Sequence, residues 1–98
     1  MILRVVMRRA ALDELDNAVL WYEGQRSGLG QAFFQEIEST VHDAAASPWR
    51  FPVVHADIRR VVARRFPYCI YVRERGDLLV VVAIFHAKRD PQVWRNRS

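Results

Sequence analysis

The first residues of the chain alternate between apolar and polar side chains. Within residues 2–7, Leu3, Val5 and Met7 fall on one side of an extended chain and Arg4 falls on the other. Alternation with a period of two is typical of a β-strand. Because the segment is short, we expect a strand at the edge of a sheet.

From Ala10 onward the spacing of apolar residues changes to that of a helix. Apolar side chains three or four positions apart form one stripe, which contains Leu12, Leu15, Val19 and Tyr22. Acidic residues occupy the opposite side, namely Asp13, Glu14, Asp16 and Glu23. This pattern predicts an amphipathic helix with one buried face and one solvated face.

A glycine-rich break and a second helical stripe follow. Gly28, Leu29 and Gly30 interrupt the periodicity in a way that suits a tight connection between antiparallel helices. The second apolar stripe contains Phe33, Ile37, Val41 and Ala44. Pro48 ends this helix. We expect a helical hairpin lying on a sheet, with Glu36 and the other helix acids in water.

The segment after the hairpin lacks a sustained period. Residues 47–57 contain two prolines, so we expect an irregular surface loop that Trp49 and Phe51 hold in place. Two strands are then expected, at residues 58–65 and 68–74, and Phe66-Pro67 marks the break between them because proline cannot donate to a strand ladder.

A last strand is expected after a compact turn at residues 75–77. It begins at Leu78, runs through the longest apolar stretch of the chain and is stopped by Pro91. An unbroken valine-rich run is typical of a strand covered on both faces, so we place it at the centre of the sheet. Residues 92–97 form either one helical turn or an extended tail. The expected order, β-α-α-β-β-β, is an α+β fold: a helical hairpin packed on a small, mainly antiparallel sheet, with residues 1–98 as a single domain.

Composition limits the classes of protein to consider. Hydrophobic residues make up 51% and charged residues 27% of the chain, which is ordinary for a globular protein. The single cysteine, Cys69, excludes an intramolecular disulfide, and we find no apolar run of membrane-spanning length. We therefore expect a cytoplasmic protein without a membrane partner. His42 and His55 lack partners at metal-binding spacing, so we expect neither metal nor cofactor.

Charge is unevenly distributed along the chain. Residues 1–47 contain four arginines and seven acidic residues, a net charge of −3, whereas residues 48–98 carry a net charge of +7. Fourteen of the fifteen basic residues are arginine, which suits bidentate contacts to carboxylate and phosphate, although a codon bias would give the same preference. The basic half ends in a cluster that we expect on the rim of the core: His86, Lys88, Arg89, Trp94, Arg95 and Arg97.

The order and spacing of several short motifs resemble the RelE/ParE superfamily of bacterial toxins from type II toxin–antitoxin modules. The resemblance covers almost the whole chain. It is carried by Trp21-Tyr22, Gly28-Leu29-Gly30, Phe33, Glu36, Pro48, Phe51-Pro52, Arg59-Arg60, Arg65-Phe66-Pro67-Tyr68, Ile70, Tyr71, His86, Arg89-Asp90-Pro91, Trp94 and Arg97. It implies a toxin that a cognate antitoxin neutralises, with operator DNA bound only through the antitoxin.

The resemblance leaves two targets open. Members similar to RelE cut mRNA on the ribosome, and members similar to ParE inhibit DNA gyrase without nuclease activity. Arg65 and His86 occupy positions where ribonuclease members place a phosphate-binding arginine and, in some, a histidine. Those members add a tyrosine or a lysine cluster near the C-terminus, whereas this chain has one lysine and no tyrosine after Tyr71. The resemblance therefore favours the ParE-like branch, which binds its target and performs no chemistry.

The expected target-binding residues are Arg64, Arg65, His86, Lys88, Arg89, Trp94 and Arg97, and only a ribonuclease would make Arg65 and His86 catalytic. Each also has a structural interpretation: His86 as a packed histidine, Arg65 as a partner of Glu74 or Asp57, Trp94 as a lid on the core. A nucleic-acid-binding module and a degraded toxin that binds only antitoxin are further alternatives. The acidic polar faces of both helices argue against a helix that reads a DNA groove.

Overall fold

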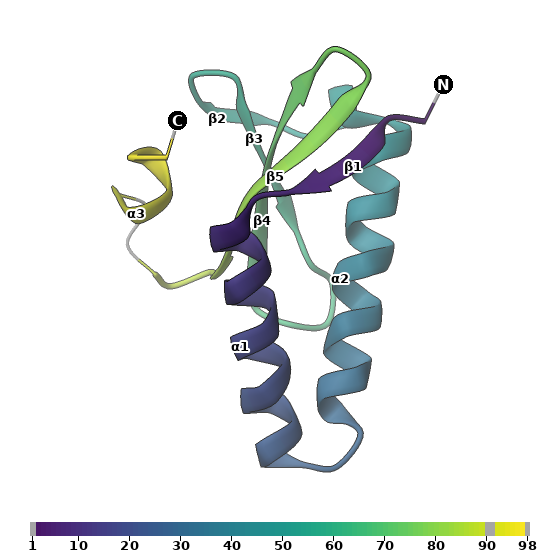
Figure 1. The fold of residues 1–98 in the computed structure, drawn as a ribbon, viewed down its shortest axis with the longest axis vertical. Coiled ribbons are helices and arrows are strands. Elements are labelled where there is room, and N and C mark those ends of the chain that lie inside the picture. Colours follow the sequence, from purple (N-terminus) through teal and green to yellow (C-terminus); the bar gives the residue numbers. More distant parts are fainter. Residues whose placement is uncertain (1, 90–91, 98) are drawn as a thin grey trace.

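The computed structural model describes residues 2–89 and 92–97, and of Val93 only the backbone. Two long helices lie side by side against one face of a five-stranded sheet (Figure 1). In chain order the elements are β1 (Arg4–Met7), α1 (Arg9–Gln25), α2 (Leu29–Ala46), the 3-10 helix η1 (Pro48–Arg50), β2 (Val53–His55), β3 (Ile58–Val62), β4 (Tyr68–Arg75), β5 (Leu78–His86) and α3 (Gln92–Arg95).

The sheet has the order β1-β5-β4-β3-β2. β1 is an edge strand, as predicted, and it pairs with β5 in parallel, while all other pairs are antiparallel. The predicted α+β class and the helical hairpin are therefore confirmed. One segment differs from the prediction: residues 47–57, expected to form an irregular loop, contain η1 and the short strand β2.

The apolar strand β5 is interior and buried on both faces, as its composition predicts. The middle position of the sheet belongs to its neighbour β4, which corrects the expectation of a central last strand. The register with β4 shifts between the pairs Tyr71–Ala83 and Val72–Val81, so that Val82 forms a bulge. Val82 and Ala83 accordingly both pack into a second cluster with Trp94, while Val81 packs toward the two long helices.

The buried face of α2 is the one that its apolar spacing predicts, whereas the buried face of α1 differs from the prediction. All four predicted stripe residues of α2 are buried: Phe33, Ile37, Val41 and Ala44. In α1 the buried residues are Ala11, Leu15 and Ala18, while Leu12 is exposed. The stripe of α1 is thus rotated by about one position, because small alanines allow the helix to approach the sheet closely.

The glycine turn between the helices follows from local sterics. Gly28 has a φ of 89°, which only glycine adopts readily. A Cβ atom on Gly30 would lie 2.5 Å from the carbonyl oxygen of Val19, so α1 and α2 can approach there only without a side chain. The Glu23 carboxylate accepts the Gly28 and Gly30 N–H groups at 2.9 and 3.0 Å, which fixes the start of α2.

The segment after α2 is held by only one of the two aromatics expected to hold it. Phe51 packs against the core, whereas Trp49 is 72% exposed. In the described part of the chain, no helix combines the length and the apolar composition that crossing a bilayer requires.

Candidate functional site

The residues predicted to bind a target lie in three parts of the fold. Arg64 and Arg65 are in the connection between β3 and β4, His86 to Arg89 lie at the end of β5, and Trp94 and Arg97 belong to the C-terminal segment. Tyr68 and His86 form a cross-strand pair, and the Ala87 N–H donates to the Pro67 carbonyl at 2.7 Å. The first two groups therefore meet at one end of the sheet.

The connection carrying Arg64 and Arg65 is fixed by a carboxylate from α2. Glu36 is only 9% exposed, and its Oε2 accepts the backbone N–H groups of Arg64 at 2.6 Å and Arg65 at 2.9 Å. Its Oε1 accepts Nε–H of Arg65 at 3.2 Å. The backbone hydrogen bond from Arg65 is the main cause of the lowered pKa of Glu36. The expectation that Glu36 is solvated was wrong.

The two arginines themselves point into solvent. The Arg65 side chain is 72% exposed, so the part of the guanidinium beyond Nε is accessible to an anion. Arg64 is also exposed and lies 3.9 Å from an Asp43 carboxylate oxygen, a distance that indicates a weak surface pair. Arg65 pairs with neither Glu74 nor Asp57. Glu74 instead pairs with Arg59, and Asp57 pairs with both Arg73 and Arg75.

His86 lines a pocket between α1 and the end of β5. The pocket has a volume of about 190 Å³ and is lined by Glu14, Asn17, Ala18, Trp21, Tyr68, Ile84, His86 and Arg89. The His86 ring packs edge-on against Tyr68, with ring centroids 5.5 Å apart. Burial raises the pKa of the Tyr68 phenol, so its hydroxyl keeps its proton. Arg65 is not among the lining residues, so the two residues of the ribonuclease hypothesis do not share this pocket.

The C-terminal residues are engaged in the fold. Trp94 is buried and stacks on Tyr71, with ring centroids 4.1 Å apart, as its structural interpretation predicts. Nη2 of Arg97 donates to Oε2 of Glu14 at 2.8 Å. The expectation that Glu14 belongs to a solvated helix face was therefore wrong.

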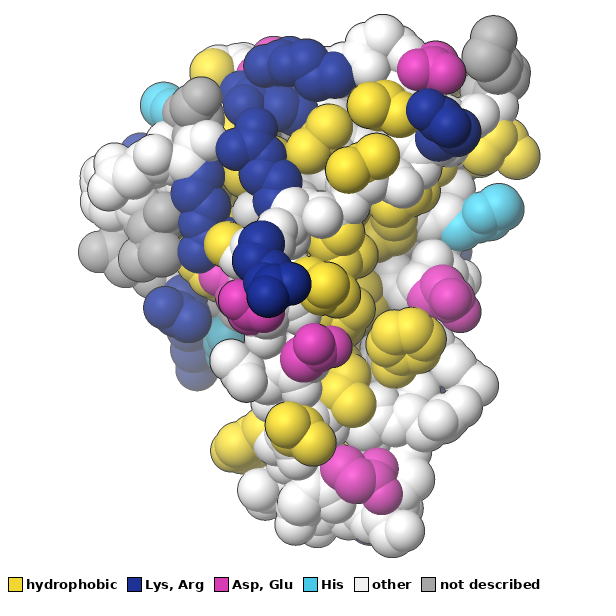
Figure 2. All heavy atoms as spheres, in the orientation of Figure 1, with side chains coloured by type: hydrophobic (Ala, Val, Ile, Leu, Met, Phe, Trp, Pro, Cys, Tyr) yellow, Lys and Arg dark blue, Asp and Glu magenta, His cyan; other side chains and the backbone are white. Residues whose placement is uncertain are grey.

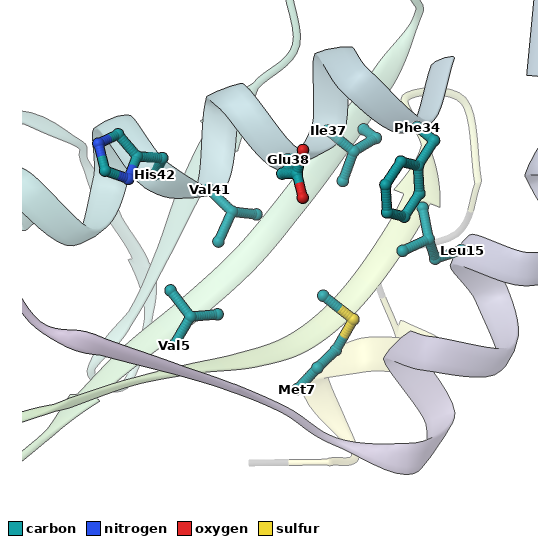
Figure 3. A pocket seen from close by; sticks show the side chains of 8 residues that line it. All are labelled: Val5, Met7, Leu15, Phe34, Ile37, Glu38, Val41 and His42. Carbon is teal, nitrogen blue, oxygen red and sulfur yellow. The ribbon is translucent and has the colours of Figure 1, made fainter. Parts of the chain in front are cut away.

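A second hollow is an apolar groove that the sequence analysis did not identify. It has a volume of about 300 Å³ and lies between β1, α1 and α2, lined by Val5, Met7, Leu15, Phe34, Ile37, Glu38, Val41 and His42 (Figure 3). The doublet Phe33-Phe34 was the available signal, because one of two adjacent large aromatics on a helix cannot face the core. Phe34 is 41% exposed.

The surface around the groove is mixed. Figure 2 shows hydrophobic side chains along the space between the two long helices and β1, with Lys and Arg side chains gathered to one side of them. Arg4, Arg8 and Arg9, on β1 and the start of α1, are exposed. The groove therefore offers an apolar floor beside positive charge.

The comparison with protein families decides the classification. Residues 5–91 match the family described as the ParE toxin of the type II toxin–antitoxin system parDE. The chain belongs to this ParE toxin family. No curated protein sequence matches it.

Solved structures share the fold of this ParE-family toxin. A chain of the chromosomal ParDE toxin–antitoxin system from P. aeruginosa aligns with a TM-score of 0.77 and 17% identity, over 87% of this chain and 96% of that one. A chain of the RelBE2 toxin–antitoxin complex from Mycobacterium tuberculosis aligns with a TM-score of 0.61 and 17% identity, over 88% and 99%. At such identities the likeness establishes the fold alone.

In the described part of this ParE-family chain, the His, Cys, Asp and Glu side chains form no group of three that could hold an ion. The chemically distinctive features are therefore the Glu36-bound arginine connection, the pocket at His86 and the apolar groove.

Proposed function

We propose that this protein is the toxin of a type II toxin–antitoxin module, that it inhibits DNA gyrase by binding, and that a cognate antitoxin neutralises it. Membership of the ParE toxin family supports the gyrase target. The two solved relatives come from a ParDE system and a RelBE2 complex, which supports an antitoxin partner.

One observation favours gyrase rather than mRNA as the target. Metal-independent RNA cleavage needs a phosphate-binding cation close to a proton-transferring group. Here Nε–H of Arg65 is committed to Glu36, and Arg65 does not line the pocket that contains His86. A protein that acts by binding does not need these two side chains in one pocket.

The apolar groove is the proposed site of the antitoxin. Its floor of Val5, Leu15 and Phe34 would take the apolar face of an amphipathic helix. The exposed arginines of β1 and the start of α1 lie beside it and would favour acidic residues on that helix. A helix bound in the groove would also cover apolar area that a chain of this size does not bury by itself.

A ribosome-dependent mRNA endoribonuclease is the second candidate. It is favoured by the shared pocket of His86 and Arg89, where a histidine and an arginine do lie together. A degraded toxin would bind antitoxin and have neither activity.

Two assays on the same purified protein test these functions. Gyrase supercoiling and ribosome-dependent mRNA cleavage should be measured side by side, with and without the antitoxin encoded next to the gene. We expect inhibited supercoiling, intact mRNA and full relief by the antitoxin. Cleaved mRNA with normal supercoiling would establish the second candidate instead, and no effect in either assay would indicate a degraded toxin.

A further inference from the structure

The pocket at His86 lies on a different side of α1 from the apolar groove. Leu15 faces the groove, whereas Asn17, Ala18 and Trp21 face the pocket. Ala18 is small and buried, which leaves the hollow between α1 and the sheet open. A helix lying in the groove would therefore leave this pocket accessible from its own side.

The pocket offers hydrogen-bond donors. Nδ1 of His86 accepts the backbone N–H of Lys88 at 3.1 Å, which leaves Nε2 as the ring nitrogen that can donate to a ligand. The Arg89 guanidinium lies 4.6 Å from the centroid of the Phe85 ring. Among the described residues, no carboxylate forms an ion pair with that guanidinium, and Arg89 lines the pocket.

Glu14 is the carboxylate among the described lining residues, and Arg97 already neutralises it. Oε1 of Glu14 accepts the Ile84 N–H at 3.0 Å and Nη1–H of Arg97 at 3.1 Å, and Oε2 accepts Nη2–H of Arg97 at 2.8 Å. With Glu14 committed to Arg97, no other described lining residue brings a negative charge to oppose Arg89. The pocket is therefore suited to an anion.

An apolar wall borders these donors. Trp21 lines the pocket and is 60% exposed, and the adjacent Leu20 is 71% exposed. Tryptophan and arginine are enriched among the residues that contribute most to binding at protein interfaces. A ligand that places an anion on Arg89 can at the same time cover the indole with an apolar group.

The surrounding charge distinguishes a protein ligand from a nucleic acid. The solvated side of α1 carries Asp13, Asp16 and Glu23, all exposed. A phosphate backbone running along α1 would meet these carboxylates, whereas a peptide brings a single carboxylate and can continue with uncharged residues. We propose that this pocket binds an aspartate or glutamate side chain of the toxin's protein target, with a neighbouring apolar side chain of the target covering Trp21. The inference rests on the proposed function, in which the target is a protein.

A titration of the intact protein with small probes tests the pocket directly. The probe is the dipeptide acetyl-Phe-Asp-amide, with acetyl-Phe-Asn-amide as the uncharged match and AMP as the nucleotide comparison. The indole N–H signal of Trp21 and the side-chain amide signals of Asn17 report binding in ¹⁵N–¹H NMR spectra. We expect the Asp dipeptide to shift both signals and to bind at least about tenfold more tightly than its Asn match and than AMP.

Two matched variants distinguish specific binding in the pocket from general attraction to the positive charge of the protein. Arg89→Gln should weaken binding of the Asp dipeptide by about tenfold or more. Arg26→Gln removes the same charge from an exposed side chain that does not line the pocket, and it should change the affinity by less than about twofold. Equal losses in the two variants, unshifted Trp21 and Asn17 signals, or tighter binding of AMP would overturn the proposal.

Supercoiling assays with the same variants keep the two proposals distinguishable. If Arg89→Gln loses the dipeptide but inhibits gyrase as well as the wild type does, the pocket does not serve the target and the gyrase function stands. If the wild type binds the dipeptide through Arg89 but never inhibits supercoiling, the gyrase function fails and the carboxylate site stands.

Discussion

Glu36 and Arg65 are joined twice, because the carboxylate of Glu36 accepts both the backbone N–H of Arg65 at 2.9 Å and its Nε–H at 3.2 Å. A residue of α2 thereby sets both the path of the β3–β4 connection and the direction of an exposed guanidinium. Phe66 supports the same connection from inside, with its ring centroid 5.0 Å from that of Tyr22. The exposed guanidinium is thus held in place, which would lower the entropy lost if a target bound it.

Replacing Glu36 by glutamine should destabilise the protein. The amide keeps one acceptor oxygen but loses the charge that strengthens the hydrogen bonds from Arg64 and Arg65. We expect the free energy of unfolding to fall by about 2 kcal/mol, measured by urea denaturation at pH 7. Glu38→Gln is the control, because Glu38 is exposed two residues further along the same helix, and it should change stability by less than about 0.5 kcal/mol. Equal effects of the two variants would show that the hydrogen bonds to Glu36 contribute no net stability.

Stability should also fall in acid through Asp57. Hydrogen bonds from Arg73, and then from Arg75, lower the pKa of Asp57 from 3.8 to about 2. Because the pKa is lower in the folded state, the contribution is complete above pH 3.8 and is lost as the pH falls toward 2. The Asp57 side chain is 46% exposed, so after allowance for solvent screening we expect a loss below about 2 kcal/mol.

Asp57→Asn should remove that acid-dependent loss and lower stability at neutral pH. Arg73 is 4% exposed, so its charge would then be buried without this carboxylate partner, at a cost of about 2–3 kcal/mol. Urea midpoints at pH 7, 4, 3 and 2 would be compared with those of the wild type and of Asp16→Asn, a change at an exposed position. If the difference between Asp57→Asn and wild type were the same at every pH, the assignment to Asp57 would fail.

Arg97 should stabilise the protein by satisfying an otherwise unpaired edge of β5. β1 pairs with β5 only as far as Met7 and Val81. Beyond that point Nη1–H of Arg97 donates to the Val82 carbonyl at 3.2 Å, and Glu14 accepts the Ile84 N–H at 3.0 Å. Arg97 thus completes the strand edge with a side chain where no neighbouring strand does so.

Truncating Arg97 to alanine should lower the free energy of unfolding by about 1–3 kcal/mol. Part of the cost arises because Glu14, whose side chain is 16% exposed, loses its counter-charge. A double-mutant cycle with Glu14→Gln would isolate the pair. Arg9→Ala is the matched control: the Arg9 side chain is 85% exposed and lies 3.8 Å from Asp13, so we expect less than about 0.5 kcal/mol. A coupling energy between Arg97 and Glu14 no larger than that between Arg9 and Asp13 would contradict the prediction.

The fold was accessible from the sequence wherever local spacing determines burial. Phe33 and Ile37 repeat at a helical interval and are buried, and the valine-rich run of β5 is buried on both faces. The contacts that shape the candidate site were not accessible in this way. Glu36 reaches a backbone N–H 28 residues away and Glu14 reaches one 70 residues away, and nothing in the local pattern separates such a carboxylate from a solvated one.

The groove and the short strand β2 escaped prediction for related reasons. Periodicity places Phe33 in the core and turns Phe34 outward, but only the packing of α2 against β1 and α1 creates a groove beside Phe34. β2 has three residues and follows two prolines, so it carries no periodicity of its own and forms because β3 offers an edge.

Phe34→Glu should abolish binding of the antitoxin while leaving the toxin folded. Phe34 lines the groove and is 41% exposed, so a carboxylate there stays solvated in the free toxin but would be desolvated under the apolar face of a bound helix. We expect the dissociation constant of the antitoxin complex to rise at least about a hundredfold, measured by calorimetry, with an unfolding midpoint close to that of the wild type. Trp49→Glu places the same charge on an exposed aromatic that does not line the groove, and it should leave the affinity within about threefold. Equal weakening by both variants would point to general electrostatic repulsion between an added acid and an acidic antitoxin, and unchanged affinity in Phe34→Glu would place the antitoxin elsewhere.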